Sequence, residues 1–191
     1  MFEFVLGREE EALRHAEELI RDMPGRADLH EQRALILCDM GRFDEARIAA
    51  GRALAGAPKH PEFLDTMGIV ERMAGNPGAA LPRLVDSAVA RPSYPRARAE
   101  LAVCQVQLGR VGEATAALET LPRYALRDPF VTYAQAALAI ARGADDDAIV
   151  FLREAGRVRP ELGIRAGVDP LFRAILGDNA RRVGFVQAVR H

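Results

Sequence analysis

The sequence has no tryptophan, one lysine, two serines and two cysteines among its 191 residues. Two cysteines cannot form a disulfide framework, and their scarcity fits a reducing compartment. We expect Cys38 and Cys104 to be buried small hydrophobes. Neither serine, Ser87 nor Ser93, lies in the Gly-x-Ser-x-Gly motif, so the nucleophile elbow of serine hydrolases is absent.

Charge of one sign and long apolar runs are also lacking. The formal net charge is -1, which leaves no overall basic field to attract nucleic acid or anionic lipid. No apolar run approaches the roughly 18 residues of a membrane span, and the first ten residues have no basic region typical of a secretory signal. We therefore expect a cytoplasmic protein. The strong use of alanine, glycine and arginine over lysine is typical of a GC-rich bacterial genome.

Motifs for catalysis or metal binding are missing as well. The sequence contains no P-loop, no dinucleotide-binding Gly-x-Gly-x-x-Gly and no His-Glu-x-x-His. The histidines are scattered, at His15, His30, His60 and His191. The acidic run 145–147 follows a glycine and is better explained as the start of a helix than as a metal site. We expect no enzyme activity, no cofactor and no metal.

What the sequence does contain is a repeat of 34 residues. Glycine recurs with this step at Gly7, Gly41, Gly75, Gly109, Gly143 and Gly177. Alanine follows each of the first five glycines by five residues, at Ala12, Ala46, Ala80, Ala114 and Ala148. Proline and small-residue columns keep the same register, at Pro24, Pro58, Pro92 and Pro160 and at Ala34, Gly68, Ala102 and Ala136. Several columns agreeing in one register indicate a repeat protein.

These columns resemble the tetratricopeptide repeat. Residues 41–46, Gly-Arg-Phe-Asp-Glu-Ala, followed by Ala53 and Pro58, match its pattern closely, and residues 109–114 are similar. The resemblance covers about residues 1–162. It implies an all-α protein, a right-handed α-solenoid of stacked antiparallel helical hairpins.

The residues themselves support two amphipathic helices in each unit. In residues 27–60 the first helix should run from about Asp28 to Met40, with Gly41 ending it in a left-handed conformation. Prolines 61, 95 and 129 suit the first turn of a helix, and Asp128 should cap the last of these helices. One hairpin cannot bury its apolar face alone, so neighbouring hairpins must stack.

We frame a single solenoid domain over residues 1–191, with four full repeats at 27–60, 61–94, 95–128 and 129–162. Residues 1–26 hold the second helix of an earlier unit, with residues 1–6 too short to be its partner helix. These six residues fold back, pair with another chain, or indicate that the natural start lies upstream. Residues 163–191 should form a capping helix pair, with short helices at 170–176 and 179–190.

One repeat departs from the pattern in its second half. Leu126 occupies the place of the closing proline, and Pro122 comes four residues early. The second helix of this repeat should therefore be shortened, with residues 123–127 forming a longer connection.

The resemblance also implies a site, because the first helix of each hairpin lines the concave face in this family. Transfer by register gives a partner-binding groove lined by Asp28, Glu31, Leu35, Asp39, Asp65, Ile69, Arg72, Arg96, Val103, Val106, Phe130, Tyr133 and Ile140. The groove is acidic toward its N-terminal end and apolar toward the other. It would suit a peptide or helix with apolar and basic parts, and not the acidic tails bound by carboxylate-clamp members. In the alternative interpretation, Phe130 and Tyr133 are core residues beneath the C-terminal tail. The acidic residues of the predicted groove are then only a solvent-exposed helix face.

The sequence thus predicts a protein–protein interaction scaffold or adaptor, including the narrower role of a bacterial assembly or secretion chaperone. Two alternatives stay open. A self-assembling structural protein would use the apolar residues near its ends, residues 2–6 and Phe185, Val186 and Val189. A regulatory subunit of an enzyme complex would still act by binding. No nucleic-acid or membrane partner is expected.

Overall fold

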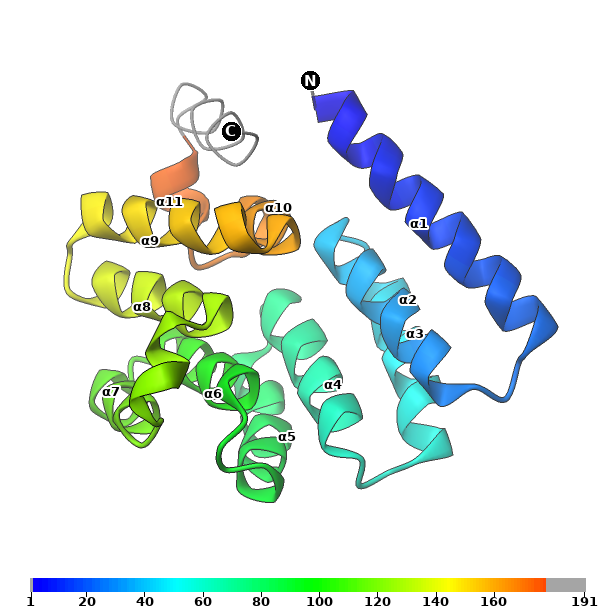
Figure 1. The fold of residues 1–191 in the computed structure, drawn as a ribbon, viewed down its shortest axis with the longest axis horizontal. Coiled ribbons are helices and arrows are strands. Elements are labelled where there is room, and N and C mark those ends of the chain that lie inside the picture. The colour runs from blue at the N-terminus through cyan, green and yellow to red at the C-terminus, as the bar shows by residue number, and fades with distance from the viewer. Residues whose placement is uncertain (1, 178–191) are drawn as a thin grey trace. The chain divides into compact units, whose positions relative to one another are not determined.

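The computed structural model describes residues 2–177, with the backbone alone for residues 2–7 and Ala174. Within this range every regular element is a helix, and successive helices pack in pairs (Figure 1). The pairs include α2 (Ala27–Asp39) with α3 (Phe43–Gly56) and α8 (Pro129–Ala141) with α9 (Asp145–Val158). The predicted all-α class and hairpin architecture are confirmed.

The chain forms two compact units, residues 1–87 and 88–191. Unit 1 contains α1 (Phe2–Asp22), α2, α3 and α4 (Pro61–Met73), and α5 (Pro77–Ala90) crosses the boundary. Unit 2 contains α6 (Pro95–Gln107), α7 (Val111–Glu119), the 3₁₀ helix η1 (Arg123–Arg127), α8, α9, α10 (Pro160–Val168) and α11 (Arg173–Leu176). The expected repeat boundaries and single solenoid domain stay predictions.

Four of the repeated glycines end the first helix of a hairpin, at Gly41, Gly75, Gly109 and Gly143. Their φ angles are 76°, 87°, 73° and 72°, a left-handed conformation that costs glycine no side-chain clash. At the first of these turns, the Gly41 N–H donates to Cys38 O at 3.0 Å and the Arg42 N–H to Leu37 O at 2.8 Å. This is the Schellman pattern, and the same pair of bonds recurs at the other three turns.

Helix starts also follow the sequence. Pro61, Pro95 and Pro129 occupy the first turn of α4, α6 and α8, where a backbone N–H would have no helical partner. The Asp128 carboxylate caps α8 by accepting the Phe130 N–H at 2.9 Å. The observed first helix of residues 27–60 begins and ends one residue earlier than the expected Asp28–Met40.

The remaining two glycines of the column do not form such turns. Gly7 lies inside α1, which runs without a break from Phe2 to Asp22, so residues 2–6 extend this helix and do not fold back on it. Five residues are too few to nucleate a helix of their own. Carrying one helix through a single glycine costs only about 1 kcal/mol. Gly177 has a φ of −66° and is likewise not left-handed.

The irregular second half of repeat 95–128 is confirmed. Helix α7 has 9 residues where α3 and α9 have 14, and η1 fills the connection predicted at residues 123–127. In the tail, the Asp169 carboxylate accepts the Leu171 N–H at 3.0 Å at the start of a turn that leads into α11. The expected helix 179–190 and the apolar residues 185–189 lie outside the described residues.

Alanine and glycine columns mark where helices approach closely. Ala46, Ala49, Ala50 and Ala53 of α3 are fully buried, and α3 packs on both α2 and α4. A Cβ atom added to Gly68 of α4 would lie 2.5 Å from Cγ of Leu84 in α5, so only glycine fits there.

Among the helices of residues 2–177, none has both the length and the apolar character that crossing a bilayer requires.

Candidate functional site

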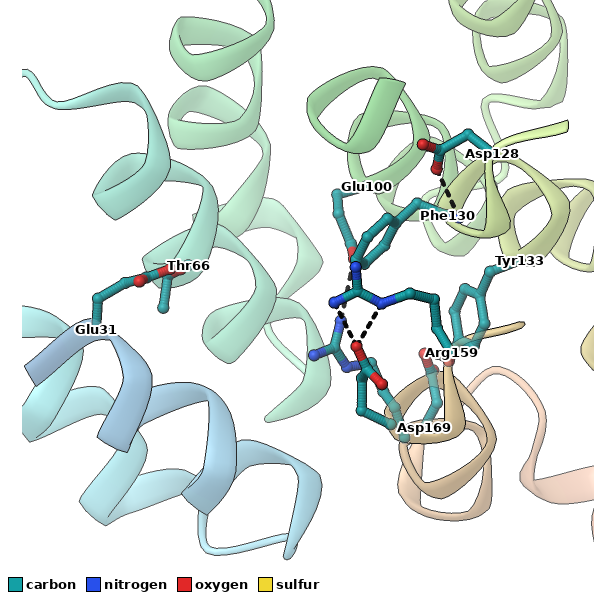
Figure 2. Close-up of polar contacts among 10 residues, drawn as sticks. Glu31, Thr66, Glu100, Asp128, Phe130, Tyr133, Arg159 and Asp169 are labelled. Atoms are coloured by element: carbon teal, nitrogen blue, oxygen red, sulfur yellow. Dashed lines mark hydrogen bonds and ion pairs between the residues drawn. The ribbon is translucent and has the colours of Figure 1, made fainter. Parts of the chain in front are cut away.

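In unit 1, helix α2 presents three of the predicted groove residues at its surface. Asp28 accepts two hydrogen bonds from the Arg26 guanidinium, from Nε at 2.8 Å and from Nη2 at 2.5 Å, and these bonds lower the pKa of Asp28. Glu31 accepts a hydrogen bond from Thr66 Oγ1 of α4 at 2.8 Å (Figure 2). Leu35 is half-buried beside them on the same helix. This acidic and apolar strip is accessible to a partner.

The other predicted groove residues of unit 1 are buried. Their exposed fractions are 9% for Asp39, 1% for Asp65 and 0% for Ile69 and Arg72. Side chains so enclosed support the fold around them and contact a partner only after a rearrangement. Whether they take part in binding stays a prediction.

Asp39 lies near an acidic residue of α1, Glu9. Glu9 is 8% exposed, and neither of its carboxylate oxygens has a hydrogen-bond partner. Burial, together with the negative charges of Asp39 and Glu10, raises the pKa of Glu9 from 4.5 to about 7. Helix α1 therefore packs on α2 through a carboxyl group that resists ionisation.

This pKa predicts a pH-dependent stability. Because the folded state holds the Glu9 proton more tightly than the unfolded state, stability falls as pH rises from about 4.5 to about 7. Glu9→Gln should stabilise the protein by about 1–2 kcal/mol at pH 8, a figure discounted for solvent screening, and should have little effect at pH 4. Urea unfolding followed by circular dichroism at both pH values tests this. An equal effect at the two pH values would show that Glu9 is ionised normally in the folded protein.

In unit 2, an aromatic ring lies between two arginines. Phe130, the second residue of α8, is half-buried, and the guanidinium carbons of Arg96 in α6 and of Arg159 each lie 5.3 Å from its ring centroid. Arg159 caps α9, and its Nη2 lies 2.5 Å from a carboxylate oxygen of Glu161 (Figure 2). Cation–π contacts of this kind hold the ring in place and leave part of it accessible.

Tyr133, one turn further along α8, is core. It is 1% exposed, and its hydroxyl donates to Asp169 Oδ2 at 2.9 Å. Its ring meets the ring of Phe172 edge-to-face at 5.1 Å between centroids. Of the two roles considered for Tyr133, these contacts match a core residue beneath the C-terminal segment.

The remaining predicted groove residues of unit 2 divide in the same way. Val103 and Val106 of α6 are 1% and 7% exposed, whereas Ile140 of α8 is half-buried. Beside the valines lies an enclosed ion pair, in which Arg165 Nη1 of α10 donates to Glu100 Oε1 at 3.3 Å. Their side chains are 3% and 2% exposed, so α6 and α10 are joined by a pair of charges shielded from water.

Sequence reasoning missed Arg159, Asp169 and the Glu100–Arg165 pair. Arg159 precedes Pro160 of the proline column, and this position was its only signal. The hydrogen bond between Asp169 and Tyr133 depends on how the last helices fold back, which the repeat pattern does not describe. Cys38 and Cys104 are buried thiols, as expected. Residues 2–177 contain no cluster of three metal-binding side chains.

Comparisons with known proteins agree with this architecture. A family model described as tetratricopeptide repeat matches residues 72–138, about a third of the chain. No curated protein matches the sequence.

Solved structures show the same fold. A thermophilic TPR protein of Thermus thermophilus is 20% identical with a TM-score of 0.64, over 98% of this chain and 94% of that one. PilW, described as a widely conserved type IV pilus biogenesis factor, is 20% identical with a TM-score of 0.59, over 96% and 86%. YrrB, described as a TPR protein with an unusual peptide-binding site, is 15% identical with a TM-score of 0.51, over 86% and 84%. The predicted resemblance to the tetratricopeptide repeat is thus confirmed, by a family model that matches the middle of the chain and by solved TPR proteins that share the fold over nearly all of it.

Proposed function

We propose that this chain is a protein-binding scaffold that holds a peptide or helix of another protein against the first helices of its hairpins. The observation that carries the proposal is the Phe130 cluster, a half-buried ring between Arg96 and Arg159 on the face where α6 and α8 begin. Aromatic residues, phenylalanine included, and arginine are enriched in protein–protein interfaces. The peptide-binding site named for YrrB, a protein of the same fold, supports the same general role.

The partner's chemistry follows from the accessible residues of each unit. In unit 1, Asp28, Glu31 and Leu35 would receive a segment with basic and apolar side chains. In unit 2, Phe130 and Ile140 would receive apolar side chains. The buried members of the predicted groove would hold these side chains in position. Within this function we favour a cytoplasmic adaptor, and an assembly or secretion chaperone is its narrower form.

The test compares two substitutions of an apolar residue by serine in unit 2. Phe130→Ser removes the proposed anchor, and Val150→Ser removes a valine of α9 that is 58% exposed and outside the proposed site. Each full-length variant is used for affinity purification from the organism that encodes the chain, with quantitative mass spectrometry. We expect one protein to be depleted roughly tenfold or more with Phe130→Ser alone.

Circular dichroism and thermal unfolding show first that both variants are folded. If both retain the same proteins in the same amounts as the original chain, the Phe130 cluster is not the site. Binding would then have to be sought on the outer helices.

A further inference from the structure

The 3₁₀ helix η1 is a surface feature that the other hairpins lack. Pro122 has no backbone N–H, and the chain after α7 continues as a tight turn in which the Ala125 N–H donates to Pro122 O at 2.9 Å. Leu121 and Ala125 are 7% and 2% exposed and anchor this turn to the core of unit 2. η1 is therefore a fixed projection.

This projection carries an exposed aromatic residue between two arginines. Tyr124 is 74% exposed, Leu126 is 43% exposed, and Arg123 and Arg127 are exposed. Residues three apart in a 3₁₀ helix share a face, so Tyr124 lies beside Arg127 and Arg123 beside Leu126. Neither arginine forms an ion pair with any side chain that the structure describes. Tyrosine and arginine are the residue types most enriched at binding hot spots.

A complementary surface lies at the other end of α8, in the segment Gly143–Asp147, which comprises the end of the turn and the first three residues of α9; we call it the Gly143–Asp147 turn. Asp145, Asp146 and Asp147 are exposed, and none forms an ion pair with a described residue. The three aspartates occupy the first turn of α9, as expected for the start of a helix, but the N-cap is Ala144 and no side-chain hydrogen bond caps this helix. Together with Gly143 they line an open hollow of about 310 Å³.

The two surfaces cannot neutralise each other within one copy of the chain. η1 ends directly before α8, and the acidic turn begins directly after it (Figure 1). A helix of 13 residues is about 20 Å long, whereas charges are screened beyond about 8–10 Å at physiological salt. Helix α8 therefore keeps a basic projection and an acidic hollow apart, on opposite ends of a rigid spacer.

We propose that η1 of one copy docks into the Gly143–Asp147 turn of a second copy. Arg123 and Arg127 pair with the aspartate carboxylates, and the Tyr124 hydroxyl donates to one of them. The Tyr124 ring packs over Gly143, which has no side chain to obstruct it and a φ of 72°. Because the two surfaces differ, the contact is heterologous, and each added copy offers a further projection and a further hollow. Copies of this chain thus join head to tail through unit 2.

The contact is small and charged, which sets its expected behaviour. We expect a dissociation constant of about 10–100 µM, because the interface is small and polar. We also expect the association to weaken strongly as salt is added. Size-exclusion chromatography with light scattering should give a mass that rises with concentration at about 20 mM salt and returns to that of one chain at about 500 mM salt.

Three sets of substitutions locate the contact, and all of them change exposed residues. The projection variant carries Arg123→Gln, Tyr124→Ser and Arg127→Gln, and the hollow variant carries Asp145→Asn, Asp146→Asn and Asp147→Asn. The matched control carries Arg153→Gln and Arg157→Gln, which neutralise two exposed arginines of α9. Each of the first two variants should stay at the mass of one chain, and the control should associate like the original protein.

A mixture of the projection and hollow variants is the decisive sample. Each retains the surface that the other has lost, so one contact can form but cannot continue, and the mass should stop at two chains. Three results would overturn the proposal: an original chain that stays single up to about 500 µM at about 20 mM salt, variants that associate like it, or a mixture that stays single. If the acidic surface of another protein is the natural occupant of η1, the original chain will stay single and the proposal fails.

Discussion

Replacing Glu100 by alanine should lower the free energy of unfolding by about 3–5 kcal/mol. The substitution leaves the Arg165 guanidinium enclosed without the carboxylate 3.3 Å away, in a site where the two side chains are 2–3% exposed. Charges so shielded from water depend on their partners, because neither can be solvated in place. The expected loss far exceeds that of an exposed pair such as Arg110–Glu113, which water and salt screen.

A double substitution separates the pair's contribution from the cost of enclosing one of its charges without the other. Glu100→Met with Arg165→Met removes both charges and keeps most of the volume, so it should recover much of the lost stability. Urea unfolding of the three variants, followed by circular dichroism, provides the comparison. A loss below about 1 kcal/mol for Glu100→Ala would mean that water reaches Arg165 and that the pair is not a buried one.

Most of the helical hairpins could be predicted from the sequence because their boundaries depend on local chemistry. A glycine that must be left-handed, a proline that suits the first helical turn and an aspartate that caps act within a few residues of themselves. The turn at Gly41 and the cap at Asp128 are examples. Gly7 shows the limit of this reasoning, because the same residue type in the same register lies inside a helix when no complete helix precedes it.

The candidate site was harder to predict because exposure depends on distant parts of the chain. Phe130 and Tyr133 lie three residues apart on α8 and were indistinguishable in the repeat pattern. The structure leaves Phe130 half-exposed between Arg96 and Arg159, but encloses Tyr133 against the segment that contains Asp169 and Phe172. That segment does not follow the 34-residue repeat. Positions assigned from the repeat therefore could not show which residues cover α8.

The shortened helix α7 shows the opposite case, in which a departure from the repeat was itself predictive. Pro122 four residues early required a shorter helix and a new connection, and η1 is that connection. What the sequence could not show is that Tyr124 and Leu126 point outward while Ala125 is buried. Exposure of an aromatic residue on a fixed turn is the reason that η1, and not the chain ends, carries the proposed contact between copies.

Substitutions of Tyr133 distinguish its two possible roles and should have the second large effect. Tyr133→Ala removes a fully buried ring and should cost about 3–5 kcal/mol of stability. Tyr133→Phe keeps the ring and its edge-to-face contact with Phe172 but removes one donor to the Asp169 carboxylate, so it should cost about 1–3 kcal/mol. Thermal and urea unfolding measure both. If Tyr133→Phe leaves stability unchanged but releases a bound partner, Tyr133 is a groove residue. If stability falls as expected and the partner stays bound, Tyr133 is part of the core that holds the C-terminal segment against α8, and the binding surface of unit 2 begins at Phe130.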